Sequence, residues 1–388
     1  MARGKKIPIT PTVLGWAIQE SGYEPAEVAA AAGVDRGTLA AWLAKSDLRP
    51  SLTQFRRLAS FLKRPEAVFF LPRPPPLHLP EVQFRSPSGV KHRPPSPEER
   101  LHIREAARLQ RGLAWVLEEL GERPQAMQRI ALLRNPEEAA TAARREIGVA
   151  VEQQLDWSSA SAAQHGWRAA LERRGVFVLF LPMGEESVQG FSLADEQAPL
   201  IAVNTHWNAQ ARCYTMLHEY AHLLTRTSSL CAKDWPRSAK DGDRTERWCE
   251  EFAAAFLLPW PAVEQRLSDR FHWRPGATIA SLDAARYVAN QFHVSLPAAV
   301  LRLVLKEVAG WGLFRSIPAH AERKPRGGPP GEGGRRRPQR RLDEFGAQTA
   351  RTFLRGMQRD VITRDDALRY LDVADRDLEE LQALSTTR

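Results

Sequence analysis

The sequence predicts an α+β protein that is predominantly helical. Most of its 388 residues fall into stretches with apolar residues at helical spacing. The exception is the middle of the chain, residues 175–204, where β-branched and aromatic residues form short runs separated by polar turns. Pro-rich and Gly/Arg-rich tracts interrupt the helical parts. These patterns predict an N-terminal helical bundle, a central domain with a small three-stranded sheet, and C-terminal helical segments.

The composition narrows the class of protein. Hydrophobic residues make up 43% of the chain and charged residues 26%, which fits a globular protein in water. No apolar run approaches the roughly 20 residues of a membrane-spanning helix, and the basic N-terminus lacks the apolar core of a signal peptide. Three cysteines, Cys213, Cys231 and Cys249, are too few and odd in number for a disulfide framework. We therefore expect a cytoplasmic protein with no membrane partner.

The chain carries an excess of positive charge. Its 55 Lys and Arg residues against 46 Asp and Glu residues give a net charge of +9. This balance permits contact with nucleic acid but does not establish it, because a solvated arginine-rich surface gives the same count. Part of the excess lies in one tract, residues 323–341, which has the composition of a linker.

Residues 1–76 are predicted to form the first domain, a helical bundle. Helices are expected at residues 12–20, 24–32 and 36–45, then from Ser51 to Phe61, with a short element after Pro65. The turn Gly33-Val34-Asp35 joins the second helix to the third, and Asp35 is placed to cap the third helix. A short Ala-rich helix, a tight turn and a second helix form the helix-turn-helix layout.

This segment resembles the DNA-binding domain of the XRE/Cro family of helix-turn-helix proteins. On the third helix, Arg36, Thr38 and Lys45 are the candidate DNA-binding residues. The same helix also carries Gly37 and Ala40, whose side chains are too small to reach base edges. DNA binding, recognition of another protein, and a helical bundle with no DNA partner therefore all remain open.

A Pro-rich connector, residues 77–97, is expected to lead into a central domain at residues 98–264. The central helices are expected at residues 97–120, 137–147 and 164–174. Three strands follow at residues 175–181, 190–193 and 199–204, and then a helix at residues 207–225. The sheet thus directly precedes the helix with the most informative residues of the chain.

That helix contains the motif His218-Glu219-Tyr220-Ala221-His222, abbreviated HEYAH. Two histidines four positions apart stand one helical turn from each other, so both rings can reach one metal ion. Glu219 lies between them in the sequence, where it can take a proton from a metal-bound water. The pattern indicates a metal-dependent hydrolase.

A third ligand has to come from another part of the chain, since a catalytic zinc usually has three protein ligands and one open position for water. A helix with a continuous apolar face and an acidic start follows at residues 246–258. Glu246, or Glu250 one turn later, could complete a set of two histidines and one carboxylate. The pattern of residues alone leaves both glutamates open.

Other side chains compete for a role at this site. Cys213 and Cys249 could act as ligands, but Cys213 is out of phase with the histidines on the helix, and buried thiols are common. We expect His165 and His206 to be surface or capping residues rather than ligands. Tyr214 lies one turn before the motif, where it either lines the cleft or packs in the core.

The order of these parts is similar to that of the ImmA/IrrE family of bacterial metallopeptidases, which are often fused behind an XRE-like domain. The matching stretches are Gly175–Val178, Gly190–Ser192, Pro199–Asn204, HEYAH with Leu223-Leu224, Glu246, Phe252–Ala254, Leu257–Pro259, Phe292–Ser295 and Asp360–Thr363. The resemblance implies a zincin-like domain of the gluzincin type. It also implies that His218, His222 and Glu246 bind Zn²⁺ and that Glu219 is the general base. Family members commonly carry Asn where this chain has Glu250, which bears on the choice between the two glutamates.

The resemblance also implies a function. The characteristic substrate of the family is a cognate XRE-type repressor, which is cleaved to switch on mobile-element or stress-response genes. An extended substrate could pair with the strand at residues 199–204 if that strand lies at the sheet edge. The alternative is a DNA-binding transcriptional regulator, or a toxin–antitoxin component, with a non-catalytic zincin-like core. The intact HEYAH motif favours the enzyme.

The remaining chain is predicted to be helical around one break. Residues 265–318 contain a second helix-turn-helix-like pair, for which we favour a packing role because its second helix, from residue 296, has few basic side chains. Residues 319–342 are expected to be a disordered basic linker. The segment at residues 343–388 is expected to close the chain with helices at 345–358 and 363–384.

Overall fold

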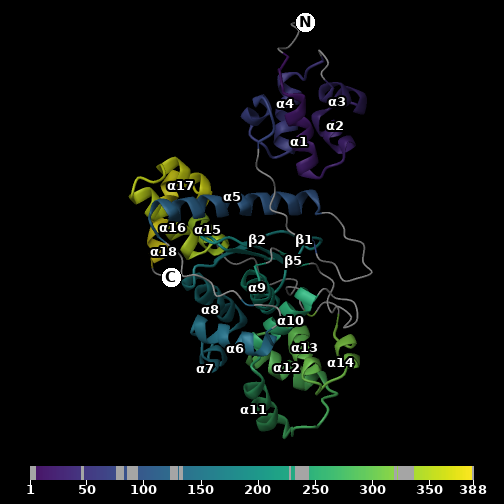
Figure 1. Ribbon diagram of the computed structural model, residues 1–388, viewed down its shortest axis with the longest axis vertical. Coiled ribbons are helices and arrows are strands. Elements are labelled where there is room, and N and C mark those ends of the chain that lie inside the picture. The colour runs from purple at the N-terminus through teal and green to yellow at the C-terminus, as the bar shows by residue number, and fades with distance from the viewer. Residues whose placement is uncertain are drawn as a thin grey trace. The chain divides into compact units, whose positions relative to one another are not determined.

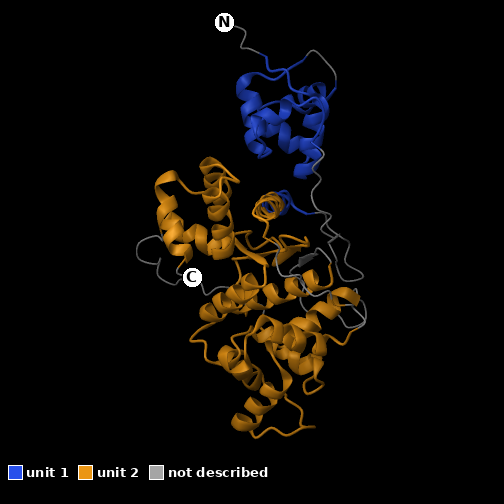
Figure 2. Cartoon of the chain, turned by 60° about the vertical axis from the view of Figure 1, so that its left-hand side comes forward, with its two compact units in different colours: residues 1–80, 94–105 blue, residues 81–93, 106–388 orange. Residues whose placement is uncertain are grey.

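The computed structural model describes residues 6–44, 48–75, 83–84, 95–122, 130, 134–226, 229–231, 244–318, 321 and 336–386. The chain divides into two compact units, as Figure 2 shows. Unit 1 comprises residues 1–80 and 94–105, and unit 2 comprises residues 81–93 and 106–388. Among the described residues, no single helix is long and apolar enough to cross a membrane, although the bent pair of helices at residues 282–305 reaches that length and composition when counted together.

Unit 1 is a small helical bundle. Its elements are α1 Pro11–Ser21, α2 Pro25–Ala32, α3 Arg36–Leu43, α4 Leu52–Phe61 and the 3₁₀ helix η1 Glu66–Phe70. The predicted caps are confirmed, because Asp35 accepts a hydrogen bond from the Thr38 amide at 2.9 Å and Ser51 forms a capping box with Gln54. The core of this unit gathers apolar side chains from every element, including Leu14, Val28, Leu39, Phe55 and Phe69.

The long helix α5, Pro97–Glu119, begins in unit 1 and ends in unit 2. In unit 2 it lies over one face of the sheet, while α9, Ala209–Leu224, lies on the other face (Figure 1). Gln110 on α5 is buried, and its Nε2 donates to the carbonyls of Leu193 and Ala198 at 2.9 Å each. This amide ties α5 to the turn between two strands of the sheet.

The sheet contains the three predicted strands, β2 Phe177–Leu181, β3 Gly190–Leu193 and β4 Leu200–Asn204. Two short strands that the sequence did not predict extend it, β1 Gln83–Phe84 and β5 Ser229–Cys231, in the order β1-β5-β3-β4-β2. β2 runs parallel to β4, and β3 runs antiparallel to both β4 and β5. The condition for substrate pairing at residues 199–204, a place at the sheet edge, is not met, because β2 and β3 cover the two sides of β4.

Below the sheet, one hydrophobic core joins the remaining helices of the central region (Figure 1). These helices are α6 Pro136–Ile147, α7 Val151–Leu155, α8 Ala160–Arg173, α9, α10 Arg244–Leu257, α11 Trp260–Phe271, α12 Leu282–Gln291, α13 Leu296–Leu305 and α14 Trp311–Arg315. α13 is buried continuously from Pro297 to Val304, which supports the packing role expected for the α12–α13 pair. The sequence predicted a domain boundary at residue 264, but buried residues before and after this position belong to the same hydrophobic core.

The C-terminal segment consists of α15 Arg337–Phe345, α16 Ala347–Gln358, α17 Arg364–Leu371, η2 Asp375–Asp377 and α18 Leu378–Thr386. The expected disordered linker at residues 319–342 is wrong at its end, since residues 337–342 are helical; residues 322–335 lie outside the described chain. The helix expected at 363–384 is interrupted at Asp372, which has a left-handed φ of 46°.

Two buried side chains explain why α15 forms where a linker was expected. Arg168, on α8, donates to the carbonyls of Asp343 and Glu344 at the end of α15 and to the carbonyl of Val178 on β2. Its partner Glu172 lies 3.0 Å away and accepts a hydrogen bond from the amide of Gln348. These contacts between residues distant in the sequence hold α15 against the sheet. The charged composition of residues 337–345 does not predict them.

Candidate metal centre

Helix α9 places the two histidines of the HEYAH motif. Asn208 caps the N-terminus of the helix, and its side chain accepts a hydrogen bond from the amide of Ala211 at 2.9 Å. One turn of helix brings the Nε2 atoms of His218 and His222 to 3.2 Å from each other. Both rings are buried. The sequence therefore sets this half of the site by local helical geometry alone.

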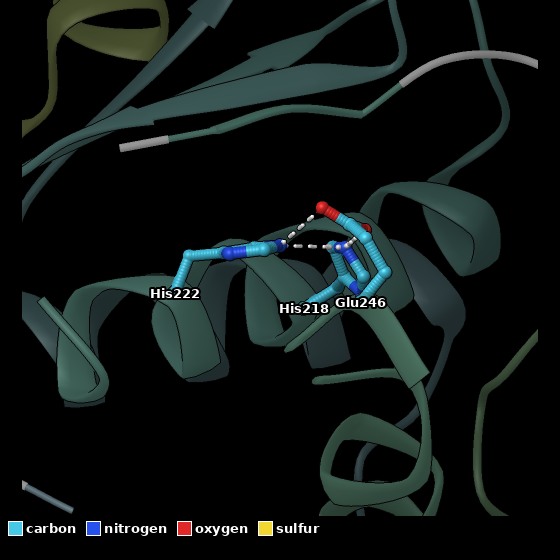
Figure 3. A group of neighbouring side chains, drawn as sticks. All are labelled: His218, His222 and Glu246. Carbon is cyan, nitrogen blue, oxygen red and sulfur yellow. Dashed lines mark hydrogen bonds and ion pairs between the residues drawn. The ribbon is translucent and has the colours of Figure 1, made fainter. Parts of the chain in front are cut away.

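Helix α10 supplies the third side chain from its first turn. The Oε2 atom of Glu246 lies 3.4 Å from Nε2 of His218, and its Oε1 atom lies 3.4 Å from Nε2 of His222 (Figure 3). Within the described residues, the one group of candidate metal ligands consists of these three side chains, which are all buried. Glu250 is not in this group. Of the two glutamates that the sequence left open, Glu246 is the one that reaches the histidines.

The spacing of the three side chains suits a metal ion of the expected size. Ligand atoms at about 2.0–2.1 Å from a tetrahedral zinc stand about 3.3 Å from one another. The two imidazole nitrogens are 3.2 Å apart, and each lies 3.4 Å from a different oxygen of the Glu246 carboxylate. Two imidazoles and one carboxylate also match the donors that zinc takes in open, three-ligand sites.

The charge of the group suits a cation. Burial by itself would raise the pKa of the Glu246 carboxyl, but the neighbouring His222 and His218 rings and their hydrogen bonds hold that pKa well below its usual range. Glu246 is therefore a carboxylate at neutral pH, and its negative charge points at the two ring nitrogens.

Glu219 lies on the side of α9 that faces the sheet and is completely buried. On the adjacent strand β3, a Cβ added at Gly190 would lie 3.6 Å from Cγ of Glu219. The same Cβ would lie 2.6 Å from Cγ2 of Thr215 and 2.8 Å from the carbonyl oxygen of Ala202. A side chain has no room there, so glycine at position 190 allows β3 to approach α9 closely at Thr215, one turn before Glu219.

The competing residues lie outside the group of three. Cys213 and Cys249 are buried, and burial raises the pKa of the Cys213 thiol to about 12. His165 is exposed, and His206 is 3.9 Å from Glu185 in a partly exposed pair. Tyr214 is buried and donates its hydroxyl to the carbonyl of Glu250 at 3.1 Å, so it links α9 to α10.

The candidate DNA-binding residues lie in unit 1. Arg36 is exposed, and the hydroxyl of Thr38 donates to Asp35 at 2.8 Å as part of the cap of α3. Lys45 lies outside the described residues. Their contact with DNA stays a prediction.

The comparison with protein families adds one finding. Residues 171–304 match the Peptidase_M78 family model, the IrrE N-terminal-like domain. The matched stretch of this IrrE-like domain runs from the last turn of α8 to the end of α13, and it includes all four residues of the site. It supports the resemblance to the ImmA/IrrE family and a metallopeptidase-like function. No curated protein matches the chain.

Gln110 and Gly190 support the site, and neither was assigned a role from the sequence. A glutamine on an amphipathic helix has the pattern of a solvent-facing residue, so the hydrogen bonds from Gln110 to the β3–β4 turn leave no local signal. Gly190 stands in a short β-rich run, where an isolated glycine can mark a close backbone approach. In the sequence, that glycine was the clue to the close packing of β3 on α9 at Thr215.

Proposed function

We propose that this chain is a zinc-dependent endopeptidase. In this proposal His218, His222 and Glu246 bind the metal, and Glu219 is the general base. One observation carries it: the buried group of two histidines and one glutamate, built from the HEYAH helix inside the IrrE-like domain. The donor types, their spacing and the family match agree on the same class of chemistry.

In the proposed peptide hydrolysis, the metal, Glu219 and Glu246 have different chemical roles. A bound zinc ion supplies a Lewis acid that acidifies water and polarises the scissile carbonyl. Glu219 accepts the proton of the attacking water and returns it to the nitrogen of the leaving amine. Its burial between α9 and β3 fixes its position and keeps bulk water from competing for that proton. Glu246 compensates part of the positive charge of the site.

The proposed substrate is an XRE-type repressor, and cleavage would derepress mobile-element or stress-response genes. The resemblance to the ImmA/IrrE family supports this choice. The order of α2, a turn with Gly33 at a positive φ of 73°, and α3 in unit 1 is compatible with a module that binds DNA or the repressor itself. The proposal extends to contact with DNA through Arg36, Thr38 and Lys45.

The Glu219→Gln variant tests the enzymatic function. The amide keeps the shape of the side chain but cannot accept the proton, so cleavage of a co-expressed XRE-type repressor should fall by roughly a hundredfold or more. Zinc content, measured by elemental analysis, should stay at the parental level because Glu219 is not a proposed ligand. Cleavage at the parental rate would show that the mechanism is wrong.

A further inference from the structure

The proposed catalytic centre is enclosed. The exposed fractions of His218, His222, Glu219 and Glu246 are 2%, 0%, 0% and 2%. A peptide can be hydrolysed only if its carbonyl carbon comes within a few ångströms of these groups. Part of the chain therefore occupies the space that a substrate has to enter.

Strand β3 packs against α9 at its first residue, Gly190. A Cβ built there would lie 2.6 Å from Cγ2 of Thr215 and 3.6 Å from Cγ of Glu219. One side of β3 is taken by β4, so an extended peptide that pairs with the sheet beside Glu219 needs the other side of β3. That side is the only backbone edge of β3 left for an added strand.

In the structure, β5 occupies this edge. It pairs antiparallel with β3 in the register Gly190↔Cys231, Phe191↔Leu230 and Ser192↔Ser229. β1 pairs in parallel with the outer side of β5, so β5 is held on both sides. β5 also contacts α9, the helix of the two histidines (Figure 1).

We propose that β5 is an internal pseudosubstrate that closes the centre until an extended segment of another protein displaces it. The inference rests on the proposed endopeptidase function, and it adds a latent state and a requirement on the substrate. A displacing segment has to be free of helix or sheet in its own protein, because it must offer its backbone groups to β3. β5 lies between α9 and α10 in the chain, so it belongs to neither of the helices that carry the proposed ligands.

A cross-strand disulfide tests whether β5 has to move. Ser192 and Ser229 are directly opposite, and Cα atoms of opposite residues in antiparallel strands stand about 4.5–5.5 Å apart, within the range that a disulfide bridges. The variant Ser192→Cys/Ser229→Cys, made with Cys231→Ser to prevent mispairing, is oxidised with oxidised glutathione to lock β5 on β3. For comparison, the same protein is reduced and the reductant is removed, which frees β5 from the disulfide bond to β3.

The first readout needs neither metal nor activity. Metal-free protein is treated with diethyl pyrocarbonate, and modification of His218 and His222 is followed by mass spectrometry. The locked form should react on the order of tenfold more slowly than the reduced form, because local opening governs access to buried groups. The exposed His165 should react equally in both forms and serves as the internal control. Equal rates at His218 and His222 in the two forms would overturn the proposal.

A second pair of variants separates this inference from the proposed function. Leu230→Pro removes a backbone donor from β5, whereas Leu230→Ala keeps it. With zinc-loaded protein and fluorescein-labelled casein as an unstructured probe, Leu230→Pro should cleave several-fold faster than Leu230→Ala. If Leu230→Pro exposes the two histidines to diethyl pyrocarbonate and neither variant cleaves casein, the closing role of β5 stands and the endopeptidase proposal loses support. If Leu230→Pro folds but leaves the histidines protected, the pseudosubstrate proposal is overturned.

Discussion

The carboxylate of Glu246 lies 3.4 Å from Nε2 of His218, although the two residues belong to different helices, α10 and α9. The same carboxylate reaches His222 with its other oxygen at 3.4 Å. Tyr214 adds a second connection between the helices through its hydrogen bond to the carbonyl of Glu250. The packing of α10 on α9 thus decides which of the two nearby glutamates faces the histidines.

Glu246→Gln should therefore lose zinc, and Glu250→Gln should not. The amide of glutamine is a poor zinc ligand and carries no charge to balance the cation, so we expect affinity for zinc to fall by roughly a hundredfold or more. Competition with a chelator of known zinc affinity measures the loss in both variants. The assignment of the third ligand would be wrong if Glu250→Gln lost zinc and Glu246→Gln retained it.

Gly190→Ala should destabilise the site without touching a proposed ligand. The new Cβ would meet the side chain of Thr215 at 2.6 Å and the backbone of Ala202 at 2.8 Å, so β3 would have to move away from α9. Overpacking of this kind costs about 1–3 kcal/mol of unfolding free energy. Urea denaturation measures this loss, and a casein-cleavage assay reports the shift of β3.

The matched control is Gly312→Ala on the short helix α14. A Cβ at this position meets nothing within 4 Å, and alanine is a better helix former than glycine. The unfolding free energy should stay the same or rise slightly. A similar loss of unfolding free energy in both variants would show that overpacking against Thr215 and Ala202 does not cause the destabilisation.

The sequence predicted the parts of this fold that local rules control. The HEYAH pair needs one turn of helix, the caps at Asp35 and Ser51 need a few neighbouring residues, and the three longer strands carry a clear β-rich pattern. The family match at residues 171–304 agrees with the resemblance drawn from the same stretches. Each of these signals is complete within a short window of sequence.

Features that depend on distant residues could not be predicted in this way. Strands β1 and β5 are extended because β1 pairs with β5 and β5 pairs with β3. Their own sequences carry no strong strand signal. α15 has the composition of a linker, but Arg168 on α8, distant in the sequence, donates hydrogen bonds to its last carbonyls and holds it in place. Glu246 and Glu250 share a face of α10 one turn apart, so the choice between them depends on the position of α10 along its axis beside α9, which the packing of the core fixes.

The two described thiols should be inert in the folded protein. Cys213 and Cys249 are buried, and burial raises the pKa of Cys213 to about 12, so little of the reactive thiolate forms at neutral pH. Mass spectrometry after treatment with iodoacetamide should find both unmodified in native protein and both modified in urea. An added Ser268→Cys, at an exposed position on α11, should react readily in native protein. Rapid native labelling of Cys213 would contradict its place in the core.

An ion-pair cluster should make the stability of unit 2 depend on pH. Glu137, at the start of α6, pairs with Arg302 at 2.5 Å and with Lys306 at 3.2 Å. Partial burial acts to raise the pKa of Glu137, but the hydrogen bonds and charges of Arg302 and Lys306 outweigh it and lower this pKa below the ordinary value of 4.5. The folded protein therefore binds the proton less readily than the unfolded chain. The stabilisation is complete above the ordinary pKa and is lost as pH falls through the folded-state pKa.

Glu137→Gln should accordingly lower the unfolding free energy by about 1–2 kcal/mol at pH 7, since Arg302 is buried and loses a charged partner. The exposed neighbour Glu138 lies in the same helical turn, so Glu138→Gln is the matched control and should change stability by less than about 0.5 kcal/mol. Urea titrations at several pH values measure both variants. The gap between the parent and Glu137→Gln should shrink as pH falls from 4.5 toward the folded-state pKa, because the unfolded parent then binds a proton that the folded parent does not. A gap that stayed constant with pH would show that packing, and not charge, carries the contribution of Glu137.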